Sequence, residues 1–221
     1  MILGIYGSGG LGRELAHVAE ESNGNLRWNI IVFIDDINDA EYVNGYKVYR
    51  FDAFRKLAEE QPSEVVIGIG EPASREKLFD RISKAGLISA NIVHPTSDFP
   101  SSCSLGKGSV LLNGARVSPN TVIGDNVVIN FNCNIGHDCF VGNNSVVSTF
   151  VAMGGGSSVG RNTFIGMGSI IRDHISIGNN SIVSMGSHVF KNVPDNVTVF
   201  GSPARVMRTS DEGVFHNSPK S

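Results

Sequence analysis

The sequence has few of the features that mark secreted, membrane or nucleic-acid-binding proteins. Its three cysteines cannot all pair and show no Cys-x-x-Cys spacing, which argues against a disulfide framework and a zinc knuckle. The longest apolar run, 30–34, is far shorter than the roughly 18 residues that cross a bilayer. No basic segment precedes an apolar stretch at the start of the chain, so we expect no signal peptide and a cytoplasmic location. A net charge of −3 argues against nucleic acid as the main partner.

Charge is scarce in one half of the chain. Residues 105–194 carry 8 charged side chains, whereas residues 1–92 carry 24. The chain is rich in glycine (26 residues) and asparagine (20 residues), the two residue types that best tolerate positive φ in turns. We therefore expect an N-terminal domain over 1–92, a different domain over 93–200 and a C-terminal tail over 201–221.

The charge-poor half repeats every six residues. An aliphatic residue or methionine begins each hexad. The fifth residue of the hexad is small or β-branched in all fifteen hexads. The aliphatic positions are Leu105, Leu111, Val117, Ile123, Ile129, Ile135, Val141, Val147, Met153, Val159, Ile165, Ile171, Ile177, Val183 and Val189. Such a period predicts a parallel β-helix in which three hexads, 18 residues, form one triangular coil. The phase extends back through Phe99 and Val93, and five full coils are expected.

The N-terminal part predicts a small α/β unit. Apolar segments at 1–6, 30–34 and 65–69 read as strands. Helices are expected after the first strand, from Asp52 as an N-cap, and from Pro72. The β-α-β-α-β-α order implies a parallel sheet, a Rossmann-like half domain too small for a full dinucleotide fold.

A glycine-rich loop follows the first strand and opens a helix. Glycines there allow a phosphate to approach the backbone, and the helix N-terminus offers free N–H groups. Asp35 and Asp36, after the second strand, are placed to accept hydrogen bonds from a ribose or a base. A mononucleotide or nucleotide sugar is favoured over NAD, and a tight turn without a ligand remains open. The loop residues concerned are Gly7, Ser8, Gly9, Gly10 and Gly12.

Six motifs appear together in this chain: GSGGLG at 7–12, FIDD at 33–36, GIG at 68–70, HPT at 94–96, GHDC at 136–139 and GSPAR at 201–205. In this order, up to about residue 208, the chain resembles bacterial nucleotide-aminosugar N-acetyltransferases. That group includes the UDP-4-amino-sugar and GDP-perosamine acetyltransferases and is related to sialic acid O-acetyltransferases. The resemblance implies a left-handed β-helix, acetyl-CoA as co-substrate, no metal, and a homotrimer with active sites between subunits. It also implies that the N-terminal domain, with Gly68 and Gly70, holds the nucleotide sugar.

His137 is the candidate general base. It is the third residue of its hexad and should point outward, with Gly155 beside it in the next coil. Asp138 follows and can hold one ring nitrogen, which leaves the other to accept a proton. In the resembling enzymes the matching histidine is the proposed base and the next acidic residue, often Glu, orients it. Relatives often carry a second histidine near the coenzyme nine residues later, where this chain has Val146.

Other residues complete the expected site. Asn130 occupies an outward position near His137 in sequence, and we expect it to touch substrate. The resemblance implies that the tail contacts acetyl-CoA, with Arg205 and Arg208 near its phosphates. Cys103, Cys133 and Cys139 all fall at the fifth hexad position and should face the interior, which disfavours a covalent acyl-enzyme. The coenzyme residues expected are Gly155, Asp173, Gly201, Pro203, Ala204 and Arg205.

Together with these residues, the resemblance implies direct acetyl transfer to the amine of a nucleotide-linked 4-amino-4,6-dideoxy sugar used in surface polysaccharide synthesis. A backbone N–H, for which Gly155 is the candidate, would stabilise the oxyanion. Two alternatives stay open: a sialic acid-type O-acetyltransferase, and a non-catalytic nucleotide-sugar-binding β-helix protein. A zinc-dependent hydratase of β-helix type is disfavoured because His174 and His188 form no stacked set with His137.

Overall fold

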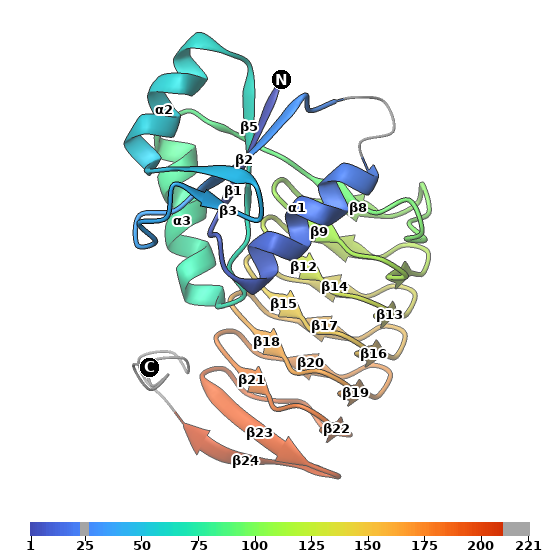
Figure 1. Ribbon diagram of the computed structural model, residues 1–221. Helices are drawn as coiled ribbons and strands as arrows, with labels where there is room; N and C mark the ends of the chain where they lie inside the picture. Colours follow the sequence, from blue (N-terminus) through green and yellow to red (C-terminus); the bar gives the residue numbers. More distant parts are fainter. Residues whose placement is uncertain (23–26, 210–221) are drawn as a thin grey trace.

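The computed structural model describes residues 1–22 and 27–209, which form an α/β domain set against a long β-helix (Figure 1). The main strands and helices of the α/β domain are β1 (Ile2–Tyr6), α1 (Gly10–Ser22), β2 (Ile30–Ile34), α2 (Phe51–Glu60), β5 (Ser63–Ile67) and α3 (Pro72–Lys84). The buried faces of β1, β2 and β5 meet the apolar stripes of the helices, as the sequence periodicity predicts.

The sheet of this domain is mixed, so the expectation of a wholly parallel sheet is wrong. Its order is β3-β4-β2-β1-β5-β6, with β1 parallel to both β2 and β5. The hairpin of β3 (Tyr42–Val43) and β4 (Tyr46–Tyr49) adds the antiparallel pair, and β6 (Ile88–Ser89) forms the opposite edge. Asn44 and Gly45, both at positive φ, make the two-residue turn that the Asn-Gly dipeptide signals.

Two element boundaries differ from expectation. Asp52 does not cap α2: the helix starts at Phe51, and the carboxylate of Asp36 accepts the Phe51 N–H at 3.0 Å instead. The third strand ends at Ile67 rather than residue 69, because the chain leaves the sheet there to form a loop. The start of α3 at Pro72 is confirmed, with Glu71 as its N-cap.

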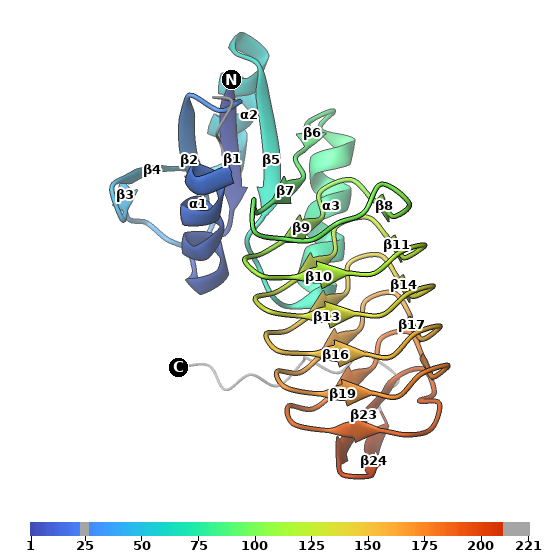
Figure 2. The same cartoon turned by 90° about the vertical axis from the view of Figure 1, so that its right-hand side faces the viewer.

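The second part is a β-helix of two-residue strands (Figures 1 and 2). Strands 18 residues apart lie in register, for example Val128 beside Val146, and build three parallel sheets. The strands are β7 (Ile92–Val93), β8 (Ser104–Leu105), β9 (Val110–Leu111), β10 (Arg116–Val117), β11 (Val122–Ile123), β12 (Val128–Ile129), β13 (Asn134–Ile135), β14 (Phe140–Val141), β15 (Val146–Val147), β16 (Ala152–Met153), β17 (Ser158–Val159), β18 (Phe164–Ile165), β19 (Ile170–Ile171), β20 (Ser176–Ile177), β21 (Ile182–Val183) and β22 (His188–Val189).

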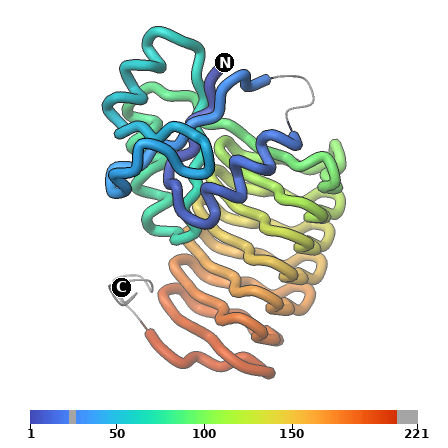
Figure 3. Tube along the Cα trace, viewed as in Figure 1, coloured from blue at the N-terminus to red at the C-terminus, as the bar shows by residue number. Residues whose placement is uncertain are grey.

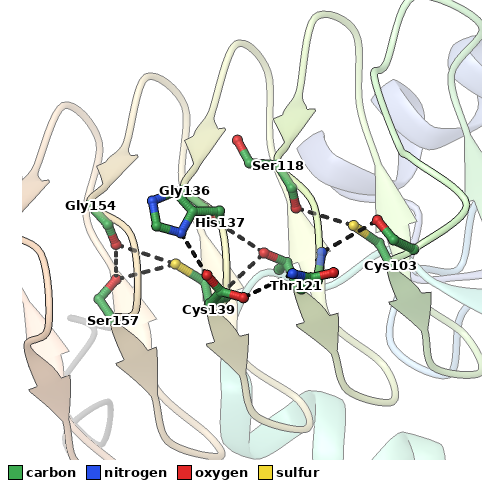
Figure 4. A network of polar contacts seen from close by, with 11 residues as sticks. Cys103, Ser118, Thr121, Gly136, His137, Cys139, Gly154 and Ser157 are labelled. Atoms are coloured by element: carbon green, nitrogen blue, oxygen red, sulfur yellow. Dashed lines mark hydrogen bonds and ion pairs between the residues drawn. The ribbon is translucent and has the colours of Figure 1, made fainter.

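Aliphatic side chains and small polar side chains fill the interior of the β-helix. The aliphatic positions from Leu111 onward are buried in one continuous cluster, as predicted. Buried hydroxyls at the fifth positions bond between coils: Thr121 donates to the Gly136 carbonyl at 2.8 Å and accepts the Cys139 N–H at 3.3 Å (Figure 4). These bonds explain why small hydroxyl residues occupy an otherwise apolar interior.

The 18-residue period ends within the last expected hexad, after Val189, which still pairs with Ile171. Val193 pairs with Ile177 and Thr198 pairs with Ile182, both 16 residues apart. Val193 therefore takes an aliphatic strand position rather than a fifth position. The chain then forms the antiparallel pair β23 (Val197–Gly201) and β24 (Ala204–Thr209), which closes the lower end of the coils (Figure 3).

The α/β domain packs on the outer face of one β-helix sheet. Leu15 and Val18 of α1 share a buried cluster with Val110, Val128 and Val146 of that sheet. Val146 is therefore part of the contact between the domains within one chain. Among the described helices, none is long and apolar enough to cross a membrane.

We predict that Ile165→Ala lowers the free energy of unfolding by about 2–5 kcal/mol, because Ile165 is 0% exposed within the stacked coils. Ile88→Ala is the matched control, since Ile88 is 63% exposed and its truncation leaves no cavity. Urea denaturation of both variants provides the measurement. Equal destabilisation by the two substitutions would contradict the assigned interior.

Candidate functional site

A cavity of about 750 Å³ opens at the carboxyl ends of β1, β2 and β5. This is the edge at which parallel α/β sheets bind ligands. Its lining residues are Tyr6, Gly7, Ser8, Gly9, Gly10, Leu11, Arg13, Asp35, Asp36, Ile37, Asn38, Gly68, Ile69, Gly70, Leu78 and Arg81. All expected nucleotide-site residues line it except Gly12, which lies behind the loop, and Asn130, which belongs to the β-helix.

The glycines of the loop divide into two groups. A β-carbon on Gly12 would lie 1.9 Å from the Gly7 carbonyl oxygen, and one on Gly68 would lie 2.6 Å from the Gly12 α-carbon. These glycines let the loop, α1 and the β5–α3 connection pack closely. At Gly9 and Gly10, by contrast, a β-carbon would meet no other atom within 4 Å. Close packing therefore explains why residues 12 and 68 are glycines. Gly9 and Gly10 are not required by packing, and they leave backbone exposed to the cavity.

Asp35 is committed to holding the loop. Its carboxylate accepts the Ser8 N–H at 2.9 Å and the Ser8 hydroxyl at 2.7 Å, and it also accepts the N–H groups of Ile37 and Asn38. Burial acts to raise the pKa of Asp35, but these hydrogen bonds outweigh it and the net pKa is lowered. With about four acceptor sites already used, this side chain shapes the cavity wall.

Asp36 lies at the centre of a second polar group. Its carboxylate accepts the Tyr6 hydroxyl at 2.6 Å, an Arg81 guanidinium N–H at 2.5 Å, and the Phe51 N–H. Burial raises the pKa of Asp36, yet the hydrogen bonds from Tyr6, Phe51 and Arg81 leave it lowered overall. Burial and the bond to Asp36 raise the pKa of the Tyr6 hydroxyl. Asp36 keeps spare acceptor capacity toward the cavity.

Sequence reasoning missed the cations of the cavity. Arg13, in the first turn of α1, and Arg81, near the end of α3, both line it. The Arg81 guanidinium also lies 4.0 Å from the centre of the Phe51 ring. The position of Arg13 directly after the glycine loop was a usable signal, whereas Arg81 reaches the cavity only through tertiary packing.

His137 lies where the sequence places it, on an outward corner between β13 and β14 (Figure 4). Its Nδ1 is 2.7 Å from an Asp138 carboxylate oxygen, and the Asn120 amide donates to the other oxygen at 3.1 Å. Hydrogen bonds from His137 and Asn120 lower the pKa of Asp138, so this carboxylate stays ionised and favours a proton on Nδ1. The imidazole is 67% exposed.

The next coil presents three consecutive glycines to this corner. A β-carbon on Gly155 would lie 2.5 Å from His137 Nε2, and one on Gly156 would lie 2.5 Å from His174 Nδ1. The His137 ring therefore lies directly against residue 155, which is possible because that residue is glycine. Asp173, two coils from His137, is exposed and lies 3.4 Å from the Arg172 Nε.

Asn130 is not brought to His137 within one chain. It follows β12, at the corner before β13, whereas His137 follows β13. Its amide oxygen accepts the Phe131 N–H at 2.7 Å. A substrate contact by Asn130 stays a prediction.

The cysteines point into the β-helix. Cys133 and Cys139 are buried, and Cys103 is half-buried against the same core. The thiol of Cys139 bonds to the Gly154 carbonyl at 3.3 Å, and burial raises the pKa of Cys133 to about 11 (Figure 4). These surroundings are those of packing thiols rather than nucleophiles.

The GSPAR segment forms the turn between β23 and β24, with a cis peptide bond before Pro203. A cavity of about 390 Å³ lies beside it and is lined by Ala204 and Arg205, but not by Gly201 or Pro203. Arg208 is on β24, opposite Thr198. Residues 210–221 of the expected tail lie outside the described residues. No cluster of three or more His, Cys, Asp or Glu within the described chain is arranged to hold a metal.

Comparison with known proteins matches both parts of the chain. The PglD N-terminal domain model matches residues 3–82. The bacterial transferase hexapeptide model matches residues 156–191, and the model of the hexapeptide repeat of succinyl-transferase matches residues 132–152. GDP-perosamine N-acetyltransferase of Escherichia coli O157:H7 is 28% identical over 143 residues, which span 62% of this chain and 63% of that protein.

Several solved structures share the whole fold. Perosamine N-acetyltransferase of Caulobacter crescentus, solved with CoA and GDP-perosamine as a variant with one histidine replaced by asparagine, is 27% identical with a TM-score of 0.86. The alignment covers 93% of this chain and 96% of that one. WeeI of Acinetobacter baumannii is 29% identical with a TM-score of 0.86, covering 94% and 100% of the two chains. The acetyltransferase domain of PglB from Neisseria gonorrhoeae, solved with acetyl coenzyme A, is 25% identical with a TM-score of 0.85, covering 93% and 98%.

The fold is that of a hexapeptide-repeat β-helix with an α/β domain at its N-terminus, and its repeats match a model of bacterial transferases. Within that class, the chain is similar over most of its length to nucleotide-sugar N-acetyltransferases, and its N-terminal domain matches the PglD N-terminal domain.

We predict that Gly12→Ala lowers the midpoint of thermal unfolding by several degrees, because the new β-carbon would collide with the Gly7 carbonyl oxygen. Gly10→Ala, with open space around residue 10, should leave the midpoint unchanged or slightly raised. Differential scanning calorimetry makes the comparison. A Gly12→Ala protein as stable as the Gly10→Ala protein would show that the loop does not pack as described.

Proposed function

We propose that this protein transfers the acetyl group of acetyl-CoA to the amino group of a nucleotide-linked 4-amino-4,6-dideoxy sugar. The observation that carries the proposal is the exposed His137–Asp138 pair facing Gly155, on a β-helix joined to an α/β domain with its own cavity. The solved relatives with CoA, acetyl coenzyme A and GDP-perosamine supply the two substrate classes.

In this proposal His137 is the general base. Asp138 holds the proton on Nδ1, so Nε2 is free to accept one. The sugar nitrogen attacks the thioester carbonyl, and Nε2 takes the proton that the nitrogen loses as the C–N bond forms. The C–S bond then breaks, and CoA leaves as the thiol after taking up that proton. No acyl-enzyme is required, in agreement with the buried thiols.

The glycine turn supplies a candidate oxyanion donor. The N–H groups of Gly154 and Gly156 already donate to the carbonyls of Ile171 and His137, each at 2.8 Å. Among the described residues, none accepts a backbone hydrogen bond from the Gly155 N–H. This N–H is thus available to a thioester oxygen placed beside the His137 ring.

The cavity of the α/β domain is the proposed nucleotide site. A diphosphate fits beside the open backbone of Gly9 and Gly10, at the N-terminus of α1 and within reach of Arg13. Asp36 and Arg81 would then face the ribose or the base. The carrier nucleotide is UDP, dTDP or GDP.

We further propose a homotrimer with active sites between subunits and acetyl-CoA lying along the coils toward Arg205. Large apolar side chains on the outside of the β-helix support an assembly of chains, because they would otherwise face water. Those exposed by about half or more are Phe140, Phe150, Met167, Ile170, Met185 and Phe190.

The direct test is release of free CoA thiol from acetyl-CoA in the presence of UDP-, dTDP- or GDP-linked 4-amino-4,6-dideoxy sugars. We expect release with one nucleotide series, and mass spectrometry of that product should show one added acetyl group. Binding of acetyl-CoA without turnover of any amine would favour a hydroxyl acceptor. Failure to bind acetyl-CoA would leave a nucleotide-sugar-binding protein as the better interpretation.

We predict that His137→Ala lowers kcat by about 10²–10⁴-fold, the usual loss when a positioned general base is removed. His17→Ala is the control, because His17 is an exposed helix residue that lines neither cavity. Thiol release measures kcat, and size-exclusion chromatography checks that assembly is unchanged. A kcat within threefold of wild type would remove His137 as the base.

A further inference from the structure

Helix α3 carries a fully buried arginine. Arg75 is 0% exposed, and no carboxylate of the described chain lies within ion-pair distance of it. Its guanidinium donates to the carbonyls of Ile67 and Ile69 at 2.8 and 2.9 Å. On the other side it donates to the carbonyl and side-chain oxygens of Asn126, at 2.8 and 2.6 Å. Burying a cation is costly without such partners, so the surrounding oxygens must be held in place.

Asn126 begins a ladder of amides that runs along one corner of the β-helix. Its Nδ2 donates to the Asn144 side-chain oxygen at 2.8 Å, and the Asn144 Nδ2 donates to the Asn162 oxygen at 3.0 Å. The three asparagines are 18 residues apart, one per coil, and all have positive φ. Each amide therefore serves as both acceptor and donor in one direction.

The ladder ends on α3 as well. The Asn162 Nδ2 donates to the Glu76 carboxylate at 2.9 Å, and the Arg161 guanidinium lies 3.5 Å from the other oxygen of Glu76. Neighbouring residues of one helix thus supply a cation at the start of the ladder and an anion at its end. Each amide donates one hydrogen bond in the direction from the arginine toward the carboxylate, so the amide dipoles add between the two charges. The Asn126 Nδ2 also donates to the Arg75 backbone carbonyl at 3.1 Å.

We propose that this α3 clamp, made of Arg75, Asn126, Asn144, Asn162 and Glu76, sets the position of the nucleotide cavity relative to the β-helix that carries His137. Arg75 is a positioning residue in this proposal, since it bonds the β5–α3 loop through Ile67 and Ile69 while bonding the β-helix through Asn126. The proposal rests on the proposed function, in which the sugar held by the α/β domain of one subunit must reach His137 of a neighbouring subunit.

The clamp has one favourable register. The coil before Asn126 has Gly108 at the same corner, and Phe79 of α3 lies 3.2 Å from where a β-carbon of Gly108 would be. The coil after Asn162 has Asn180, whose Nδ2 donates to Asn196 and not to α3. If α3 moved by one coil in one direction, Arg75 would face Gly108, which has no side-chain acceptor. If it moved by one coil in the other direction, Glu76 would face Asn180, whose Nδ2 already donates to Asn196. The clamp is thus built to fix a position and not only to add contact area.

Asn144→Gly tests the clamp at its middle rung. Glycine tolerates the positive φ of this corner, as Gly108 shows, and residue 144 lines neither described cavity. Asn180→Gly is the matched control, because it removes the same side chain from the same corner beyond the contact with α3. Hydrogen–deuterium exchange of the α3 amides measures how firmly the clamp holds α3. The kcat with the accepted nucleotide sugar measures the effect of the clamp on acetyl transfer.

We expect α3 amides to exchange at least tenfold faster in Asn144→Gly and kcat for acetyl transfer to fall about tenfold. The Kd values of the bare nucleoside diphosphate and of acetyl-CoA should stay within twofold of wild type. Asn180→Gly should change none of these. Glu76→Gln, which keeps an acceptor for Asn162, should retain activity that Glu76→Ala loses.

Two results would overturn the proposal: unchanged α3 exchange in Asn144→Gly, or faster exchange with unaltered kcat. A loss of nucleoside diphosphate affinity equal to the loss of kcat would also count against it, because the ladder would then shape the cavity itself. If wild-type protein acetylates no amino sugar, the proposed function fails, while the exchange comparison still decides whether the ladder ties α3 to the β-helix.

Discussion

The stacking of one coil on the next is the constraint on which the rest of this structure depends. Each two-residue strand is too short to be stable alone, and only its partners 18 residues away satisfy its backbone groups. The same spacing aligns the interior aliphatic side chains, the buried hydroxyls and the corner asparagines. Each outward residue consequently has neighbours 18 residues before and after it in the adjacent coils. Outward residues spaced by 18 therefore form columns that run along the β-helix.

The columns give each corner a separate chemistry. One corner stacks His137–Asp138 against three glycines, and another stacks amides that end on charges of α3. The sheet that follows the amide corner, with β9, β12 and β15, has an apolar outer face and accepts α1. The proposed catalytic residues, the bonds to α3 and the apolar contact with α1 therefore lie on different columns and do not compete for the same positions.

Most of the fold was predictable because its signals are periodic. The hexad pattern and the His137–Asp138–Gly155 arrangement need only addition of 18, and the structure places them so. The hairpin at Asn44–Gly45, the 16-residue spacing at Val193, and the use of Asp36 to cap α2 were not predicted. Each depends on a local turn or on a contact between segments far apart in sequence, which no periodicity encodes. The burial of Arg75 and the cavity role of Arg81 have the same origin.

A scaffold made of coils changes length only in steps. Removing or adding 18 residues would preserve the interior, yet it would move everything below the insertion by one strand spacing, roughly 4.8 Å. The α/β domain is anchored at the upper coils through α1 and α3, whereas Arg205 lies beyond the last coil. The number of coils between the α/β domain and Arg205 therefore sets the distance between them. Natural variation in such chains should therefore favour substitutions within columns over changes in the number of coils. Substitutions leave the distance between the α/β domain and Arg205 unchanged, whereas an added or lost coil changes it.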